Sequence, residues 1–256
     1  MLIGILETGR PPDALKDEHG SYPDMFRALI GPVDAKLEFR TYAALDGEVP
    51  EDPHACDAWL VTGSRHGVYE RTDWMLKAEE LLRRAVAEKV PVVGICFGHQ
   101  LLAQALGGKV VKSGKGWGIG FHDYELSEAH PKSGLKPGRV TIPALHQDQV
   151  VEVPEGGRVI GSSEFCQNAI IAYGDTAITF QGHPEFDRSF LEGLIEVRLK
   201  GLAPDAVLDE ARQTLADKQT DSAGIARWIA HFIIERVGQR ADAADAQANR
   251  NTAAAE

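Results

Sequence analysis

The amino-acid sequence predicts an α/β fold in which a mostly parallel sheet is covered by helices and continued by antiparallel strands. Three observations predict this fold class. Apolar runs of strand length alternate with helical patterns through the first half of the chain. Apolar runs follow one another through short connections in much of the second half, which is typical of antiparallel pairing. Hydrophobic residues make up 43% of the 256 residues, so the chain can bury a large core.

The first half supplies the alternation of strands and helices. Its clearest helical pattern covers residues 73–89, where apolar residues share one face, and Thr72 or Asp73 can cap this helix. The helix after the fourth strand ends at Gly107 and Gly108. We expect strands at 2–6, 37–42, 57–61 and 91–95, and helices at 22–30, 73–89 and about 97–106.

The second half contains consecutive strands and then helices. We expect strands at 119–126, 139–145, 158–162, 168–173 and 176–181, and helices at 188–200, 204–217 and 222–237. The apolar face of the last helix, which includes Trp228 and Ile229, either packs onto the domain or forms a homodimer or partner surface. The sequence therefore predicts a main domain at 1–200, a helical extension at 201–238 and a frayed helical or disordered tail at 239–256.

Charge and cysteine content exclude several classes of function. The formal net charge is −11, which disfavours nucleic acid and anionic membranes as partners. Cys56, Cys96 and Cys166 suit neither a disulfide framework nor a structural zinc site. The N-terminus has no signal-peptide pattern, and no apolar run approaches the roughly 20 residues that span a bilayer. We therefore predict a soluble cytoplasmic protein.

A candidate nucleophile lies where the strand at 91–95 meets the helix that begins at Phe97. The run Gly94-Ile95-Cys96-Phe97-Gly98 has the G-x-C-x-G pattern of a nucleophile elbow, in which glycines relieve crowding in a strained turn. Cys96 would sit at a helix N-terminus, which favours a thiolate, and the amide of Phe97 could bind an oxyanion. The alternative for Cys96 is a buried small hydrophobic residue.

A candidate base follows the strand at 176–181. His183 and Glu185 are two residues apart in a segment that Pro184 keeps extended, so their side chains point to the same side. The Glu185 carboxylate can then orient the His183 imidazole, as a thiol nucleophile requires of its base. The alternative for His183 is a strand-end histidine bonded to the backbone.

The two segments Gly-Ile-Cys-Phe-Gly-His-Gln and Gln-Gly-His-Pro-Glu-Phe, in this order, resemble class I (triad-type) glutamine amidotransferases. The resemblance covers about residues 1–200. It is closest to a stand-alone member of the GMP-synthase-amidotransferase or γ-glutamyl peptidase type. It implies a flavodoxin-like sheet with helices on both faces, and a catalytic triad of Cys96, His183 and Glu185.

The resemblance also implies further site residues. Gly63 matches the residue that supplies the second oxyanion amide, and Gln100 matches a contact to the glutamyl group of the substrate. The backbone of the loop that begins with His146, Gln147 and Asp148 would hold the α-amino and carboxylate ends of glutamine. Many members have proline after Gly63-Ser64, where this chain has Arg65, which is either a solvated loop residue or a contact for a substrate carboxylate.

The resemblance implies hydrolysis of the γ-amide of glutamine or a γ-glutamyl compound through a γ-glutamyl thioester, without metal or organic cofactor. Nothing after residue 200 is large enough for a synthase, so ammonia would pass to a separate synthase subunit, or the enzyme would hydrolyse γ-glutamyl peptides by itself. Two other hypotheses are a non-catalytic binding or regulatory protein on this scaffold and another Cys–His hydrolase of flavodoxin-like build.

Overall fold

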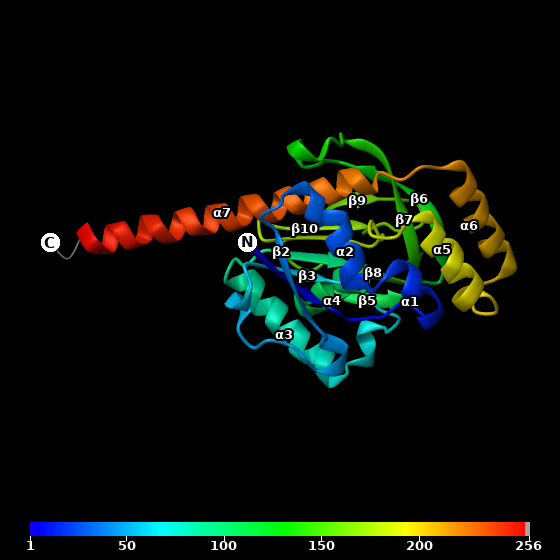
Figure 1. The fold of residues 1–256 in the computed structure, drawn as a ribbon, viewed down its shortest axis with the longest axis horizontal. Coiled ribbons are helices and arrows are strands. Elements are labelled where there is room, and N and C mark those ends of the chain that lie inside the picture. The colour runs from blue at the N-terminus through cyan, green and yellow to red at the C-terminus, as the bar shows by residue number, and fades with distance from the viewer. Residues whose placement is uncertain (254–256) are drawn as a thin grey trace.

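A nine-stranded mixed sheet forms the centre of the computed structural model, which describes residues 1–253 (Figure 1). The strand order is β2-β1-β3-β4-β11-β10-β9-β6-β7. The first five strands pair in parallel, and the remaining pairs are antiparallel. The parallel strands are β1 (Leu2–Leu6), β2 (Glu38–Tyr42), β3 (Ala58–Val61), β4 (Val92–Ile95) and β11 (Ala177–Phe180). The antiparallel extension contains β6 (Gly118–Leu126), β7 (Gly138–His146), β9 (Gly157–Ser162) and β10 (Ile170–Tyr173).

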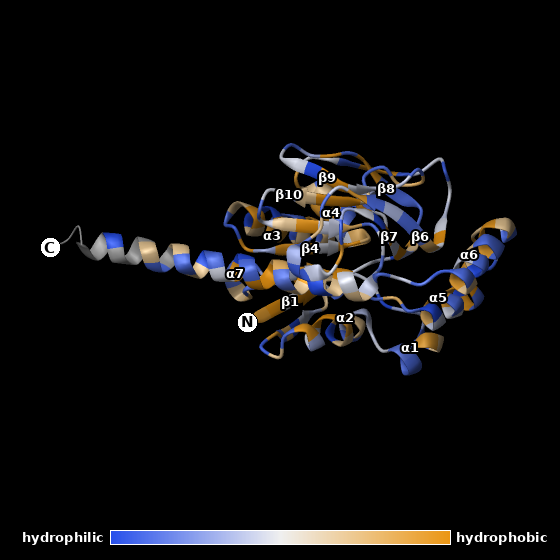
Figure 2. Cartoon of the chain, turned by 90° about the horizontal axis from the view of Figure 1, so that it is seen from above, coloured by the Kyte–Doolittle hydropathy of each residue, from blue (hydrophilic) through white to orange (hydrophobic). Residues whose placement is uncertain are grey.

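Helices cover both faces of the parallel part of the sheet (Figure 2). On one face, α2 (Tyr22–Ile30) and α7 (Ser222–Ala253) bury side chains such as Phe26 and Trp228 against the strands. On the other face, α3 (Asp73–Ala87) and α4 (Phe97–Ala105) bury Leu82 and Leu101. This arrangement confirms the predicted fold class, a flavodoxin-like α/β sheet with an antiparallel extension.

A third apolar cluster lies against the antiparallel extension. It joins Phe121 of β6 to α1 (Asp13–His19), α5 (Arg188–Leu194) and α6 (Asp205–Asp217). The π-helix η6 (Ile195–Leu199) continues α5 directly. The strands β5 (Lys109–Lys112) and β8 (Asp148–Glu152) form a separate two-stranded sheet. The remaining short elements are η1 (Gly31–Val33), η2 (Ala44–Asp46), η3 (Pro53–Ala55), η4 (Val68–Glu70) and η5 (Pro131–Ser133).

Local sequence explains where the helices near the site begin. Ser21 caps α2, since its hydroxyl accepts a hydrogen bond from the Asp24 amide while the Asp24 carboxylate accepts one from the Ser21 amide. Asp187 caps α5 by accepting from the Phe190 amide at 2.7 Å. Thr72 is the N-cap of α3, but its hydroxyl makes no capping hydrogen bond.

Three differences from the predicted elements stand out. The predicted helix at 188–200 is α5 followed by a π-helix, and α1, β5 and β8 were not predicted. The last helix runs beyond the predicted end at 237 and, as α7, reaches Ala253. Residues 254–256 of the predicted tail lie outside the described residues, and the division into domain, extension and tail stays a prediction. None of the helices described within 1–253 is both long enough and apolar enough to cross a bilayer.

Candidate active site

Cys96 is the single residue between β4 and α4. Its backbone has φ 51° and ψ −98°, a left-handed conformation that an L-residue adopts only when the surroundings enforce it. The neighbouring glycines allow the tight turn: a Cβ on Gly94 would lie 2.6 Å from backbone atoms of Gly98, and a Cβ on Gly98 would lie 2.5 Å from the Val61 carbonyl oxygen. The Cys96 amide donates to the Phe180 carbonyl at 2.7 Å, which fixes the turn to the end of β11.

His183 lies three residues beyond β11 and is 3% exposed. Its amide donates to the Pro143 carbonyl at 2.7 Å, and its ring stacks on Phe186 with centroids 4.0 Å apart. Nδ1 is 2.7 Å from Oε1 of Glu185, a carboxylate whose side chain is fully buried. The backbone and two side chains therefore hold the imidazole in one orientation.

The charge of the imidazole depends on this setting. Burial disfavours the charged form of the imidazole, but the nearby Glu185 carboxylate and Cys96 sulfur outweigh burial and raise the pKa of His183. Cys96 and His183 line the same cavity, and Glu185 lies behind His183. This geometry favours an imidazolium beside the sulfur.

The two predicted oxyanion residues flank the nucleophile. Gly63 follows β3 and lines the cavity next to His183, where an added Cβ would lie 2.6 Å from His183 Cε1. The Thr8 hydroxyl lies 2.9 Å from the Thr62 carbonyl oxygen and 3.2 Å from that of Gly63, and so fixes this loop. Phe97 is the first residue of α4, so its amide has no acceptor within the helix, while its ring is buried against Trp74.

The predicted substrate-binding residues lie on the other side of Cys96. Gln100 Nε2 donates to the Asp148 carbonyl at 2.9 Å. His146 Nδ1 is 3.2 Å from the same carbonyl, and burial lowers the pKa of His146 to about 3, so the ring stays neutral and Nδ1 donates. The segment expected to be a loop is a tight turn: β7 ends at His146, β8 begins at Asp148, and only Gln147 lies between them.

Gln181 is a site residue that sequence reasoning missed. It is fully buried, its Nε2 lies 3.7 Å from Cys96 Sγ, and its Oε1 accepts from Gln100 Nε2 at 3.2 Å. A signal was present, because Gln181 is the first residue of the same Gln-Gly-His-Pro-Glu-Phe segment that contains His183. Gln181 connects the sulfur to the residues expected to bind the glutamyl group.

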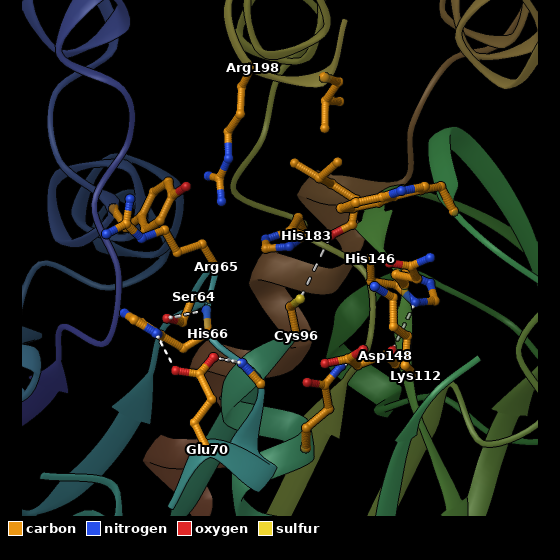
Figure 3. Close-up of a pocket in the computed structure, with 18 of the residues that line it drawn as sticks. Ser64, Arg65, His66, Glu70, Cys96, Lys112, His146, Asp148, His183 and Arg198 are labelled. Carbon is orange, nitrogen blue, oxygen red and sulfur yellow. Dashed lines mark hydrogen bonds and ion pairs between the residues drawn. The ribbon is translucent and has the colours of Figure 1, made fainter. Parts of the chain in front are cut away.

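Most of these residues line one cavity of about 260 Å³ (Figure 3). Gly63, Cys96, Gln100, His146, Gln147, Asp148 and His183 contribute to its wall, whereas Glu185 lies behind His183. Further lining residues that were not predicted include Tyr22, Lys112, Trp117 and Arg198. Within residues 1–253, no group of three or more His, Cys, Asp or Glu side chains is arranged to hold a metal ion.

Known proteins resemble this chain in sequence and in fold. Residues 15–192 match the family model described as glutamine amidotransferase class-I. The chain is 28% identical over 234 residues to γ-glutamyl peptidase 2 of Arabidopsis thaliana, covering 87% of this chain and 92% of that protein. It is 31% identical over 193 residues to γ-glutamyl peptidase 4 of the same plant, covering 73% and 76%. A solved glutamine amidotransferase from Thermotoga maritima has a TM-score of 0.67 at 20% identity over 91% of this chain and 98% of that chain, a likeness of fold.

Proposed function

The chain belongs to the class-I glutamine amidotransferase family, and on that basis we propose that it hydrolyses a γ-glutamyl amide with Cys96 as nucleophile, His183 as base and Glu185 as the group that orients His183. The observation that carries the proposal is the position of Cys96 in a strained turn beside an imidazole held by a buried carboxylate. A cysteine hydrolase requires such an arrangement, whereas a cysteine with a purely structural role does not.

In the first step, the Cys96 sulfur gives its proton to His183 and attacks the γ-carbonyl carbon of the substrate. The carbonyl oxygen becomes an oxyanion, which the amides of Phe97 and Gly63 stabilise by about 3 kcal/mol per donor. The carbon–nitrogen bond then breaks, and His183 donates its proton to the leaving nitrogen. Ammonia or an amine departs, and a γ-glutamyl thioester remains on Cys96.

In the second step, water attacks the thioester carbon while His183 accepts a proton from that water. The carbon–sulfur bond breaks, and the proton returns to Cys96 as glutamate or a glutamyl product leaves. The reacting groups of both steps come from this chain, the substrate and one water molecule. The reaction therefore consumes one water per amide bond and needs no cofactor.

The proposed substrate is a γ-glutamyl peptide. Support comes from the relatives named γ-glutamyl peptidase, which this chain covers over 92% and 76% of their lengths. The runner-up is glutamine, with ammonia passing to a separate synthase subunit. Hydrolysis of γ-glutamyl peptides by the isolated chain supports the first, and hydrolysis of glutamine that appears only when a second protein is added supports the runner-up. A cytoplasmic location and a homodimer stay predictions.

Replacement of the sulfur tests the proposal. We expect Cys96→Ala to lower glutamate release from γ-glutamyl compounds by at least about 10³-fold, because no other group can form the thioester. Cys56→Ala is the matched control. Cys56 is also buried, but its sulfur lies 3.7 Å from the Tyr42 hydroxyl, outside the cavity. Wild-type rates in the Cys96→Ala protein would remove Cys96 from the mechanism. A glutamine-like electrophile should also label Cys96 faster than Cys56 or Cys166.

A further inference from the structure

Two arginines lie at one wall of the cavity although the chain is acidic. The net charge is −11, yet Arg65 and Arg198 both line the cavity. Neither forms an ion pair with a carboxylate among residues 1–253, whereas most arginines described in the chain do. Two guanidinium groups left without a carboxylate at a cavity wall indicate that an anion from outside the chain pairs with them.

The acidic side chains of the cavity have other partners. Glu70 accepts hydrogen bonds from the Gly67 amide and lies 2.8 Å from His66 Nδ1. The Asp148 carboxylate accepts from the Tyr69 hydroxyl at 3.3 Å. Arg65 interacts with Glu70 through its charge, but neither carboxylate forms an ion pair with Arg65 or Arg198 within residues 1–253.

Arg198 lies in a segment of unusual backbone and lines the cavity together with a buried phenol. It belongs to the π-helix η6, which continues α5, and π-helical turns are rare and concentrate at functional sites. Tyr22 of α2, which is only 4% exposed, lines the same cavity; burial raises the pKa of its hydroxyl, and the positive charge of Arg198 opposes this effect. A partly buried guanidinium has less side-chain freedom to lose when it binds a carboxylate.

The position of the two arginines identifies which part of the substrate they meet. In Figure 3, Arg198 and Arg65 lie on one side of Cys96 and His183, while His146, Asp148 and Lys112 lie on the other. If Gln100 and the Asp148 segment bind the glutamyl group, the scissile carbon sits at Cys96 and the leaving amine extends toward Arg198.

Resting on the proposed function, we propose that Arg198 and Arg65 bind a carboxylate on the leaving amine. The preferred substrates are then γ-glutamyl amino acids or peptides with a free C-terminal carboxylate. Glutamine, whose leaving group is ammonia, makes no contact with this pair. The arginines thus select the leaving group, whereas Gln100 and its neighbours select the glutamyl half.

Two substrates that differ in a single group test the proposal: γ-glutamylglycine and γ-glutamylglycinamide. We expect wild-type kcat/KM to be about tenfold to a hundredfold higher for γ-glutamylglycine, the usual effect of a charge-assisted contact. Arg198→Met should reduce this ratio to near one. Arg198→Lys, which keeps the charge but loses the planar fork, should give an intermediate ratio, and Arg65→Met should lower it as well.

Arg40→Met is the matched control. Arg40 is exposed in β2, outside the cavity, so its loss removes one positive charge and should leave the ratio unchanged. A wild-type ratio near one, or a ratio unaffected by both Arg198 substitutions, would overturn the proposal. Thermal unfolding of each variant shows that its fold is intact.

A binding measurement separates this proposal from the proposed function. Should the wild-type protein hydrolyse neither compound, the proposed function fails. Calorimetric titration of the Cys96→Ala protein with the two compounds then decides the carboxylate subsite. A lower Kd for γ-glutamylglycine that disappears in Cys96→Ala/Arg198→Met supports the subsite, and equal Kd values overturn it.

Discussion

Gly63 shows how single residues set the geometry around Cys96. A Cβ on Gly63 would lie 2.6 Å from His183 Cε1, and the ring cannot retreat because Phe186 stacks on it and Glu185 holds Nδ1. We expect Gly63→Ala to lower kcat by about 100-fold, since a shift of about 1 Å in a reacting group has that effect. Steady-state kinetics on a γ-glutamyl compound measure it.

A second glycine provides the control for this prediction. A Cβ on Gly31 would meet only Phe39, at an ordinary 3.7 Å, and Gly31 lies outside the cavity. Gly31→Ala should therefore keep wild-type kcat. A Gly63→Ala protein with wild-type kcat would show that the imidazole can move without loss.

The carboxylate of Glu185 determines the pH range in which His183 is charged. Because Glu185 raises the pKa of His183 against the effect of burial, Glu185→Gln leaves burial unopposed by a neighbouring carboxylate and lowers that pKa. The imidazolium then deprotonates at lower pH, so the alkaline limb of kcat/KM against pH should move toward acid. We also expect kcat/KM at its optimum to fall by about 10²-fold to 10⁴-fold.

The pH dependence distinguishes this role from mere packing. Loss of stability in Glu185→Gln would reduce the amount of active protein equally at every pH and leave both limbs in place. An unchanged alkaline limb would contradict the assignment of Glu185 as the group that orients and charges His183.

Among the secondary-structure elements, α7 divides into a buried and an exposed part. Trp228, Ile229 and Ile233 are at most 4% exposed and pack against the sheet. Between 241 and 253, the residues whose side chains are described are exposed. We expect Trp228→Ala to lower the free energy of unfolding by about 3–5 kcal/mol, and removal of 241–256 to change it by less than about 0.5 kcal/mol.

Chemical denaturation of the two variants measures both effects. A large loss of stability on removal of 241–256 would contradict the predicted division at residue 238. A small effect of Trp228→Ala would show that α7 contributes little to the core.

Elements with strong periodic patterns could be predicted from the sequence, and short ones could not. The helix of α3 was predicted because Met75, Ala78 and Leu82 repeat along one face, and these residues are buried. In α1, Leu15 is the buried residue, so a seven-residue helix leaves no pattern. The π-helix η6 has a helical composition, and only its main-chain hydrogen bonds between residues five apart distinguish it from α5.

At the scale of the whole molecule, the proposed chemistry predicts resistance to metal removal. Each step uses Cys96, His183, two main-chain amides and water. We therefore expect glutamate release to stay within about twofold of its starting rate after dialysis against a chelator. A loss that added divalent metal restores would contradict the proposed mechanism.

The part of the site carried by local motifs could be predicted, and the part assembled by folding could not. Cys96 and Phe97 stand in a short segment whose backbone geometry follows from glycine. The extended backbone predicted for 183–185 is wrong, because residues 184–185 form a turn in which the Phe186 amide donates to the His183 carbonyl at 3.2 Å; Glu185 nevertheless lies 2.7 Å from His183. Arg198 and Tyr22 come from η6 and α2, 176 residues apart in sequence, and neither has a motif around it. Their meeting at the cavity depends on tertiary packing, which a single sequence does not display.

The main-chain hydrogen bond from Cys96 to Phe180 bears on how substrate preference can vary among related enzymes. It joins neighbouring strands of the parallel sheet, so the spacing of sulfur and imidazole is a property of the scaffold. Arg198 lies on a peripheral helical segment beyond that scaffold. Exchanging residues 188–203 for the corresponding segment of a relative should therefore change the preference for the leaving amine. The relative positions of Cys96 and His183 should stay the same.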